Sequence, residues 1–168
     1  MALQVGSEVS YNEIAQLVGV DKNTVNNYID LLEKSFVVFR LNSFSKNLRN
    51  EIKANKKIYF YDNGVRNMVM GNFNTLNLRQ DKGLLWENFL VSERMKLLSY
   101  SQSVAKPYFW RTTTQQEIDY VETNADDVSA FEFRLVNSKK TKLPKSFQEA
   151  YNPSFLVLDK DNFREFLK

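Results

Sequence analysis

Neither cysteine nor histidine occurs among the 168 residues of this chain. Their absence excludes disulfides, zinc sites built from Cys or His, thiol nucleophiles, and catalytic pairs of the Ser-His or Cys-His type. Any chemistry must therefore be carried out by carboxylates, lysine, arginine, tyrosine or a metal bound through oxygen.

Long apolar runs are also missing, because no stretch approaches the roughly 18 residues that cross a bilayer. The N-terminus lacks the basic start and apolar stretch of a signal peptide. We therefore expect no membrane partner and a cytoplasmic location. What is present suits a folded protein, since 43% of the residues are hydrophobic and 14% aromatic. The net charge of +3 suits a nucleic-acid partner without establishing one.

Residues 1–71 have the pattern of a winged helix-turn-helix. Ser10 and Glu13 form a capping box that begins a first helix, and Gly19 ends it. Asp21 begins a second helix. The apolar side of the first helix is predicted to hold Ile14, Leu17 and Val18, and that of the second Val25, Tyr28, Ile29 and Leu32. Two short helices joined by a turn that contains glycine are typical of a helix-turn-helix.

Two strands, 36–41 and 57–61, are predicted to flank a basic loop, and Asp62 to begin a short helix over 65–70. In a DNA-binding interpretation the second helix enters the major groove and the loop contacts phosphates. The residues of the helix would be Lys22, Asn23, Asn26 and Asn27, and those of the loop Lys46, Arg49 and Lys53. Asparagine can pair with adenine through two hydrogen bonds. The alternative is a module for protein contacts, whose lysines are simply solvated.

Residues 72–168 predict an α/β domain in the order helix, three strands, helix, strand. The predicted ranges are 81–98, 107–112, 117–122, 129–136, 146–151 and 155–158, followed by a last helix that Asp161 begins. This αβββαβ order is the core order of the restriction-endonuclease-like fold, so the expected fold class is α+β. The aromatic residues 108–110 are expected in the core rather than stacked on bases.

The acidic residues fall where such a nuclease needs them. Asp119 and Glu132 lie on neighbouring strands, and Glu87 interrupts the apolar stripe of the preceding helix. Two carboxylates on adjacent strands can hold Mg²⁺, which lowers the pKa of the attacking water. Strand alternation places Arg134 on the same face as Glu132.

Nuclease motifs of this type carry lysine at the position that Arg134 fills. Arginine stays fully charged and serves poorly as a proton acceptor. Two interpretations therefore stay open: a working magnesium site, or a buried ion-pair network in which Arg134 neutralises the acids. Lys139 and Lys140, in the loop that follows, would either grip a phosphate backbone or be solvated.

Nearly the whole chain resembles the C-terminal region of a widespread group of bacterial and archaeal AAA-type P-loop ATPases. In that group an ATPase module precedes a winged helix and a nuclease-like domain of unknown function. The resemblance implies that the ATPase module, and ATP as its ligand, belong to a part absent from this chain, which contains no Gly-x-x-x-x-Gly-Lys-Ser/Thr loop. The matching stretches are 10–15, 24–28, 57–64, 86–89, 109–112, 117–120 and 131–134.

Three functions follow as hypotheses. The chain is the nucleic-acid- or partner-recognition fragment of an AAA-type ATPase, with a nuclease-like fold and no activity. Alternatively, it is a Mg²⁺-dependent DNA nuclease that uses Asp119 and Glu132, with Glu87 assisting and Arg134 in place of lysine. The third hypothesis is an interaction domain that controls oligomerisation or the ATPase. The ATPase module is an expected partner in the first and third.

Overall fold

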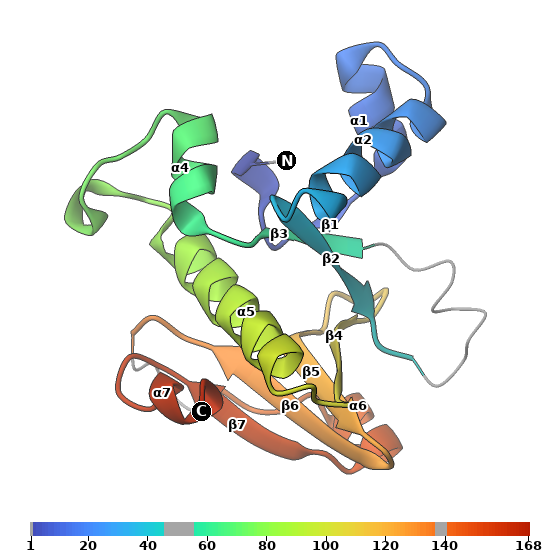
Figure 1. The fold of residues 1–168 in the computed structure, drawn as a ribbon. Coiled ribbons are helices and arrows are strands. Elements are labelled where there is room, and N and C mark those ends of the chain that lie inside the picture. The colour runs from blue at the N-terminus through green and yellow to red at the C-terminus, as the bar shows by residue number, and fades with distance from the viewer. Residues whose placement is uncertain (1, 46–55, 137–140) are drawn as a thin grey trace.

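The computed structural model describes residues 2–45, 56–136 and 141–168. Within these ranges the chain is mixed α+β, with six α-helices and one seven-stranded mixed sheet (Figure 1). None of the helices in the described part of the chain is long and apolar enough to span a membrane.

The N-terminal part builds two helices and three strands, followed by a third helix. Its elements are η1 (Ala2–Gln4), β1 (Glu8–Val9), α1 (Tyr11–Val18), α2 (Lys22–Lys34), β2 (Val38–Ser43), β3 (Lys56–Phe60) and α4 (Asn63–Met70). The predicted capping residues are confirmed, although α4 begins at Asn63 and not at Val65. The Ser10 side chain accepts from Glu13 N at 3.3 Å, Asp21 accepts from Asn23 N at 2.8 Å, and Asp62 accepts from Val65 N at 3.0 Å.

The predicted apolar faces of α1 and α2 are only partly correct. Val25 and Ile29 are buried, and Ile14 and Leu32 pack against the core. Leu17, Val18 and Tyr28 were expected on the buried side, but they are exposed. Fewer apolar residues of α1 and α2 are buried than their spacing predicts, because the sheet covers only one side of this pair of helices.

The C-terminal part follows the predicted order of helix, three strands, helix and strand. Its elements are η2 (Leu76–Leu78), α5 (Lys82–Tyr100), β4 (Lys106–Arg111), β5 (Glu117–Asn124), β6 (Asp127–Phe133), α6 (Lys145–Tyr151), β7 (Ser154–Leu158) and α7 (Phe163–Phe166). Two details differ. Strand β6 ends at Phe133 because its partner β7 ends at the paired Leu158. The residue that precedes α7 is Asn162 rather than Asp161, and its side chain does not cap the helix.

A single sheet runs through both predicted units, in the order β1-β3-β2-β4-β5-β6-β7. Strands β4, β5 and β6, the three predicted strands, form an antiparallel meander. The join between the two parts is the parallel pairing of β2 with β4, through Asn42 with Tyr108 and Ser43 with Phe109. The boundary between two domains at residues 71 and 72 stays a prediction from the sequence. The sheet is continuous across it.

Two apolar cores form in contact with the sheet. Helix α5 crosses the sheet, as Figure 1 shows, and contributes Leu90 and Val91 to the larger core. The smaller core packs Trp110 against Phe147 of α6. Phe109 and Trp110 are both buried, which confirms the expectation that these aromatic residues belong to the core.

Candidate carboxylate site

Strand β5 departs from regular pairing at the position that matters most. Its register with β4 shifts between Tyr108 and Trp110, and its ladder with β6 ends at the pair Tyr120 and Phe131. Asp119 therefore lies where β5 and β6 begin to diverge. Its carboxylate takes over from the missing backbone acceptor, because Asp119 Oδ2 accepts a hydrogen bond from Phe133 N at 2.7 Å.

Glu132 and Arg134 contact each other, as their shared face predicts. The guanidinium of Arg134 bonds the Glu132 carboxylate. The pKa of Glu132 is raised to about 7, chiefly by burial and then by nearby Asp119, while Arg134 opposes both effects. Burial also raises the pKa of Asp119, although the Phe133 amide opposes this shift. Asp119 and Glu132 are thus close enough to repel each other.

Glu87 reaches the same cluster from α5. The Tyr59 hydroxyl donates to Glu87 Oε1 at 2.7 Å, and Lys57 Nζ lies 3.5 Å from the same oxygen. Burial raises the pKa of Glu87 to about 7, with Lys57 opposing the shift and Asp119 adding to it. The Gly6 backbone is so close that a Cβ there would lie 2.9 Å from Glu87 Oε1.

Lys57, on β3, is the central cation of the cluster. Only 2% of its side chain is exposed, and its Nζ lies 2.5 Å from Glu117 Oε1. The ammonium also sits 5.2 Å from the centre of the Phe109 ring. Burial alone would lower the pKa of Lys57, but the charges of Glu87 and Glu117 outweigh it and raise the pKa. Lys57 therefore stays charged inside the protein.

Sequence reasoning identified Glu87, Asp119, Glu132 and Arg134 but missed three members of the cluster. These are Lys57, Tyr59 and Glu117. One signal was available: Lys57 and Tyr59 alternate within an apolar strand, so they share one face of β3. What could not be predicted is that β3 and β5 belong to one sheet, which brings that face to the acids.

The acids of the cluster lie among cations. Four acids, Glu87, Glu117, Asp119 and Glu132, meet the cations Lys57 and Arg134. Across residues 2–45, 56–136 and 141–168, no group of three or more acidic side chains converges closely enough to hold a metal. The predicted pair of ligands, Asp119 and Glu132, is brought together, but Glu132 is already engaged by arginine.

Comparison with known proteins finds a family match for the C-terminal half of the chain. Residues 82–166 match the family described as a domain of unknown function, DUF4143. The chain belongs to the DUF4143 family. Residues 1–76 match a second such family, DUF8612. Among curated proteins, the chain is similar to an uncharacterised protein of Haemophilus influenzae, with 25% identity over 165 residues. The match covers 96% of this chain but 35% of the relative, and no solved structure matches.

The predicted nucleic-acid contacts of this DUF4143 protein lie in different environments. Lys22, Asn23 and Asn27 are exposed on α2. Asn26 is engaged internally, since its Nδ2 donates to Asp30 at 3.0 Å and its oxygens face Arg40. Lys46, Arg49, Lys53, Lys139 and Lys140 lie outside the described residues.

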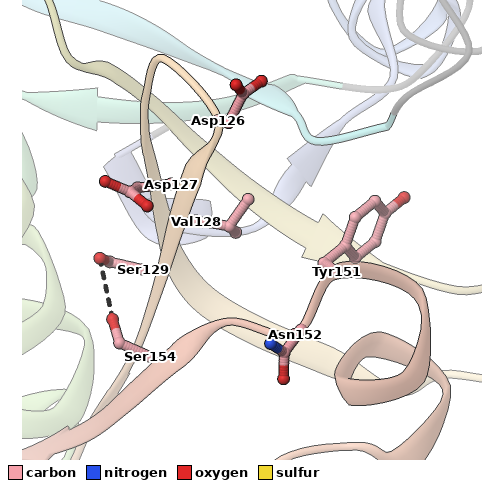
Figure 2. Close-up of a pocket in the computed structure, with 7 residues that line it drawn as sticks. All are labelled: Asp126, Asp127, Val128, Ser129, Tyr151, Asn152 and Ser154. Carbon is pink, nitrogen blue, oxygen red and sulfur yellow. Dashed lines mark hydrogen bonds between the residues drawn. The ribbon is translucent and has the colours of Figure 1, made fainter.

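A cavity of about 480 Å³ lies at the opposite end of the β5–β6 hairpin from the carboxylates. Figure 2 shows Asp126 and Asp127 on one side of it and Tyr151 and Asn152 on the other. Two other lining residues are joined by a hydrogen bond, in which Ser154 Oγ donates to Ser129 Oγ at 2.9 Å. None of the cluster acids of this DUF4143 chain lines it, so the cavity and the cluster are separate features.

Proposed function

We propose that this chain is the partner-recognition region of a longer P-loop ATPase, and that its carboxylate cluster is structural. The observation that carries the proposal is the pairing inside the cluster. Arg134 holds Glu132, Lys57 holds Glu117 and Glu87, and a backbone amide holds Asp119. In each ion pair one partner is buried and the other partly exposed, and their proposed role is to fix the relative positions of the elements that carry them. We also propose that residues 1–71 form a winged helix and that residues 72–168 have a nuclease-like fold.

The surface of α1 and α2 supports recognition of a protein. Leu17, Tyr28 and Leu31 are 86%, 64% and 57% exposed. An apolar groove of about 270 Å³ runs between the two helices, with Val18, Val20 and Tyr28 among its walls. Exposed apolar patches on a folded chain mark contact surfaces for proteins. We assign this surface to the ATPase module of the parent protein, because the chain spans only 35% of its relative's length.

Binding of DNA by the same helices has weaker support. Asn26 is committed to Asp30 and Arg40, and the apolar side chains occupy much of the exposed surface. Phosphate contacts would make affinity fall steeply with salt, with a log–log slope of about 0.9 per contact on duplex DNA. A protein contact made by Leu17 and Tyr28 depends far less on salt, so a salt titration separates the two partners.

The second candidate is a DNA nuclease, and one observation favours it. The cluster does contain a lysine, although Lys57 enters from β3 and not at position 134. This candidate requires Arg134 to release Glu132, since the two side chains are paired.

The decisive experiment measures cleavage of plasmid, single-stranded and branched DNA in the presence of Mg²⁺ or Mn²⁺. We expect no cleavage by the chain, by Glu132→Ala or by Arg134→Lys. Metal-dependent cleavage that disappears in Glu132→Ala would establish the nuclease and overturn the structural assignment. A parallel titration measures binding of the chain to the separately expressed ATPase module of the parent. Tyr28→Ser should weaken it at least about tenfold, whereas the control Tyr100→Ser should not, although Tyr100 on α5 is the more exposed of the two tyrosines.

A further inference from the structure

The N-terminal residues 2–9, here called the strap, run along the edge of the sheet beside the carboxylate cluster. They comprise η1 and β1, and β1 is the outermost strand, next to β3 (Figure 1). Glu8 of β1 lies opposite Lys57 of β3 in the antiparallel ladder. Between η1 and β1, Gly6 N donates to Ile58 O at 3.1 Å. The strap is therefore fixed in register with the strand that carries Lys57.

The strap meets the cluster at two points. A Cβ on Gly6 would lie 2.9 Å from Glu87 Oε1 and 3.4 Å from Glu87 Oε2, so the backbone of the strap rests on that carboxylate. Two residues later, Glu8 Oε1 lies 3.7 Å from Arg111 Nη1, and Arg111 Nε lies 4.0 Å from Glu117 Oε2. The strap thus borders two of the four acids of the cluster.

Two contacts hold the start of the strap in place. Val5 is only 1% exposed and belongs to the larger core. Ala2 O accepts a hydrogen bond from Arg66 Nε at 3.0 Å, and Arg66, on α4, also bonds Asp81 at 2.7 Å. A hydrogen bond from a charged donor is stronger than a neutral one. The position of the strap therefore depends on a single buried side chain of α4.

The strap has few backbone bonds to the rest of the sheet. Strand β1 is two residues long, and Gly6 adds one hydrogen bond beyond it. Edge segments with so few bonds open locally while the remainder of a chain stays folded. The pairing of Lys57 with Glu117 joins β3 to β5 and does not pass through the strap. Opening of the strap would uncover Glu87, whose side chain is 17% exposed beneath it, and leave that pair intact.

We propose that the strap is a cover that controls the access of water and solutes to the carboxylate cluster, with the contact between Arg66 and Ala2 as its latch. Lifting the strap exposes the Glu87 carboxylate without unfolding the sheet. A movement of α4, which carries Arg66, is thereby transmitted to a carboxylate on α5. The proposal concerns access to the cluster, so it does not depend on the function proposed above.

The test combines two measurements on the full chain. Amide hydrogen exchange of Gly6 reports opening of the strap, and carbodiimide labelling read by mass spectrometry reports access to Glu87. Arg66→Met removes the latch and should speed Gly6 exchange at least about tenfold, the effect of losing a hydrogen bond to a charged group. Labelling of Glu87 should rise with it. Arg79→Met is the matched control, because Arg79 is also buried and bonds the same carboxylate as Arg66, but donates to Asn72 O instead of Ala2 O. It should change neither signal.

A pair of valine variants tests the strap from its own side, without altering α4. Val5→Ala loosens the strap and should raise both Gly6 exchange and Glu87 labelling. Val25→Ala removes the same methyl groups from α2 in the same core and should raise neither. Thermal unfolding verifies that each variant folds, and the valine pair alone decides the matter if Arg66→Met does not.

Two results would overturn the proposal. Equal Gly6 exchange within either pair of folded variants would mean that the strap opens only when the whole chain unfolds. Faster Gly6 exchange with unchanged Glu87 labelling would mean that the strap does not cover the carboxylate.

Discussion

The side chain of Asn88 pairs with both backbone polar groups of Phe60. Asn88 Oδ1 accepts from Phe60 N at 2.8 Å, and Asn88 Nδ2 donates to Phe60 O at 3.0 Å. Two residues earlier, Ile58 O on the same edge of β3 accepts from Gly6 N at 3.1 Å. Helix α5 therefore continues, through one side chain, the hydrogen bonding that the N-terminal segment supplies to β3.

Asn88→Leu should lower the free energy of unfolding by about 2–4 kcal/mol, because it leaves a buried N–H and C=O of Phe60 unpaired. Urea denaturation measures the change. Asn27→Leu, at an exposed position of α2, serves as the control and should change stability by less than about 0.5 kcal/mol. A loss below about 1 kcal/mol for Asn88→Leu would show that the Phe60 groups find other partners.

Gly6→Ala should destabilise the chain more than Gly19→Ala does. Both glycines have positive φ, 72° and 71°, so both substitutions carry a backbone cost of about 1 kcal/mol. Only at Gly6 would the new Cβ meet a neighbour, Glu87 Oε1 at 2.9 Å, and nothing lies within 4 Å at Gly19. Since Tyr59 and Lys57 hold Glu87, we expect a further loss of about 1–3 kcal/mol. Equal thermal shifts for the two variants would contradict the close packing of Gly6 on Glu87.

Lys57→Met should destabilise the protein by about 3–5 kcal/mol, because Glu87 and Glu117 then lack their buried counter-charge. Adding Glu117→Gln to this variant should restore part of the loss, since it removes one of the uncompensated charges. A double-mutant cycle from chemical denaturation measures the coupling between residues 57 and 117. Additive losses, with no recovery, would mean that the two side chains do not interact.

Stability should fall as the pH rises from about 4.5 to about 7. Glu87 and Glu132 have a pKa of about 7 in the folded chain, well above the ordinary value of 4.5. The folded state thus binds more protons than the unfolded state across this window, and raising the pH favours unfolding. Asp81 contributes in the opposite sense, because its pKa is lowered, but only under more acidic conditions.

Glu132→Gln should flatten this pH dependence, which urea midpoints measured between pH 5 and pH 8 would reveal. Glu149 is exposed on α6, so Glu149→Gln serves as the control. Its urea midpoint should change with pH as steeply as that of the parent chain. A Glu132→Gln profile parallel to that of the parent would show that Glu132 is ionised across the whole range.

Local signals predicted much of the secondary structure. The caps at Ser10, Asp21 and Asp62 act within their own helices, so their sequence context was sufficient. Alternation along β6 likewise predicted that Glu132 and Arg134 meet. These features depend on neighbours within a few residues, where sequence patterns are most informative.

The parts that sequence could not provide depend on distant pairings. Nothing local shows that β2 lies beside β4, so the arrival of Lys57 at Glu117 was not foreseeable. The prediction that Tyr28 is buried was wrong for a related reason. Helical periodicity indicates the apolar face of α2, but it does not indicate how much of that face the sheet covers. Strand β1, with only two residues, was too short for a pattern to indicate.

The parallel pairing of β2 with β4 joins the two family-matched segments into one sheet, which limits how recombination can separate them. The matches to DUF8612 and DUF4143 meet between residues 76 and 82, yet separating them there would leave β4 with an open edge and Glu117 without Lys57. A gene fusion or a cloned fragment that takes only one of the two segments would carry an exposed strand, which is prone to pair with other chains. Recombination should therefore move the two segments together.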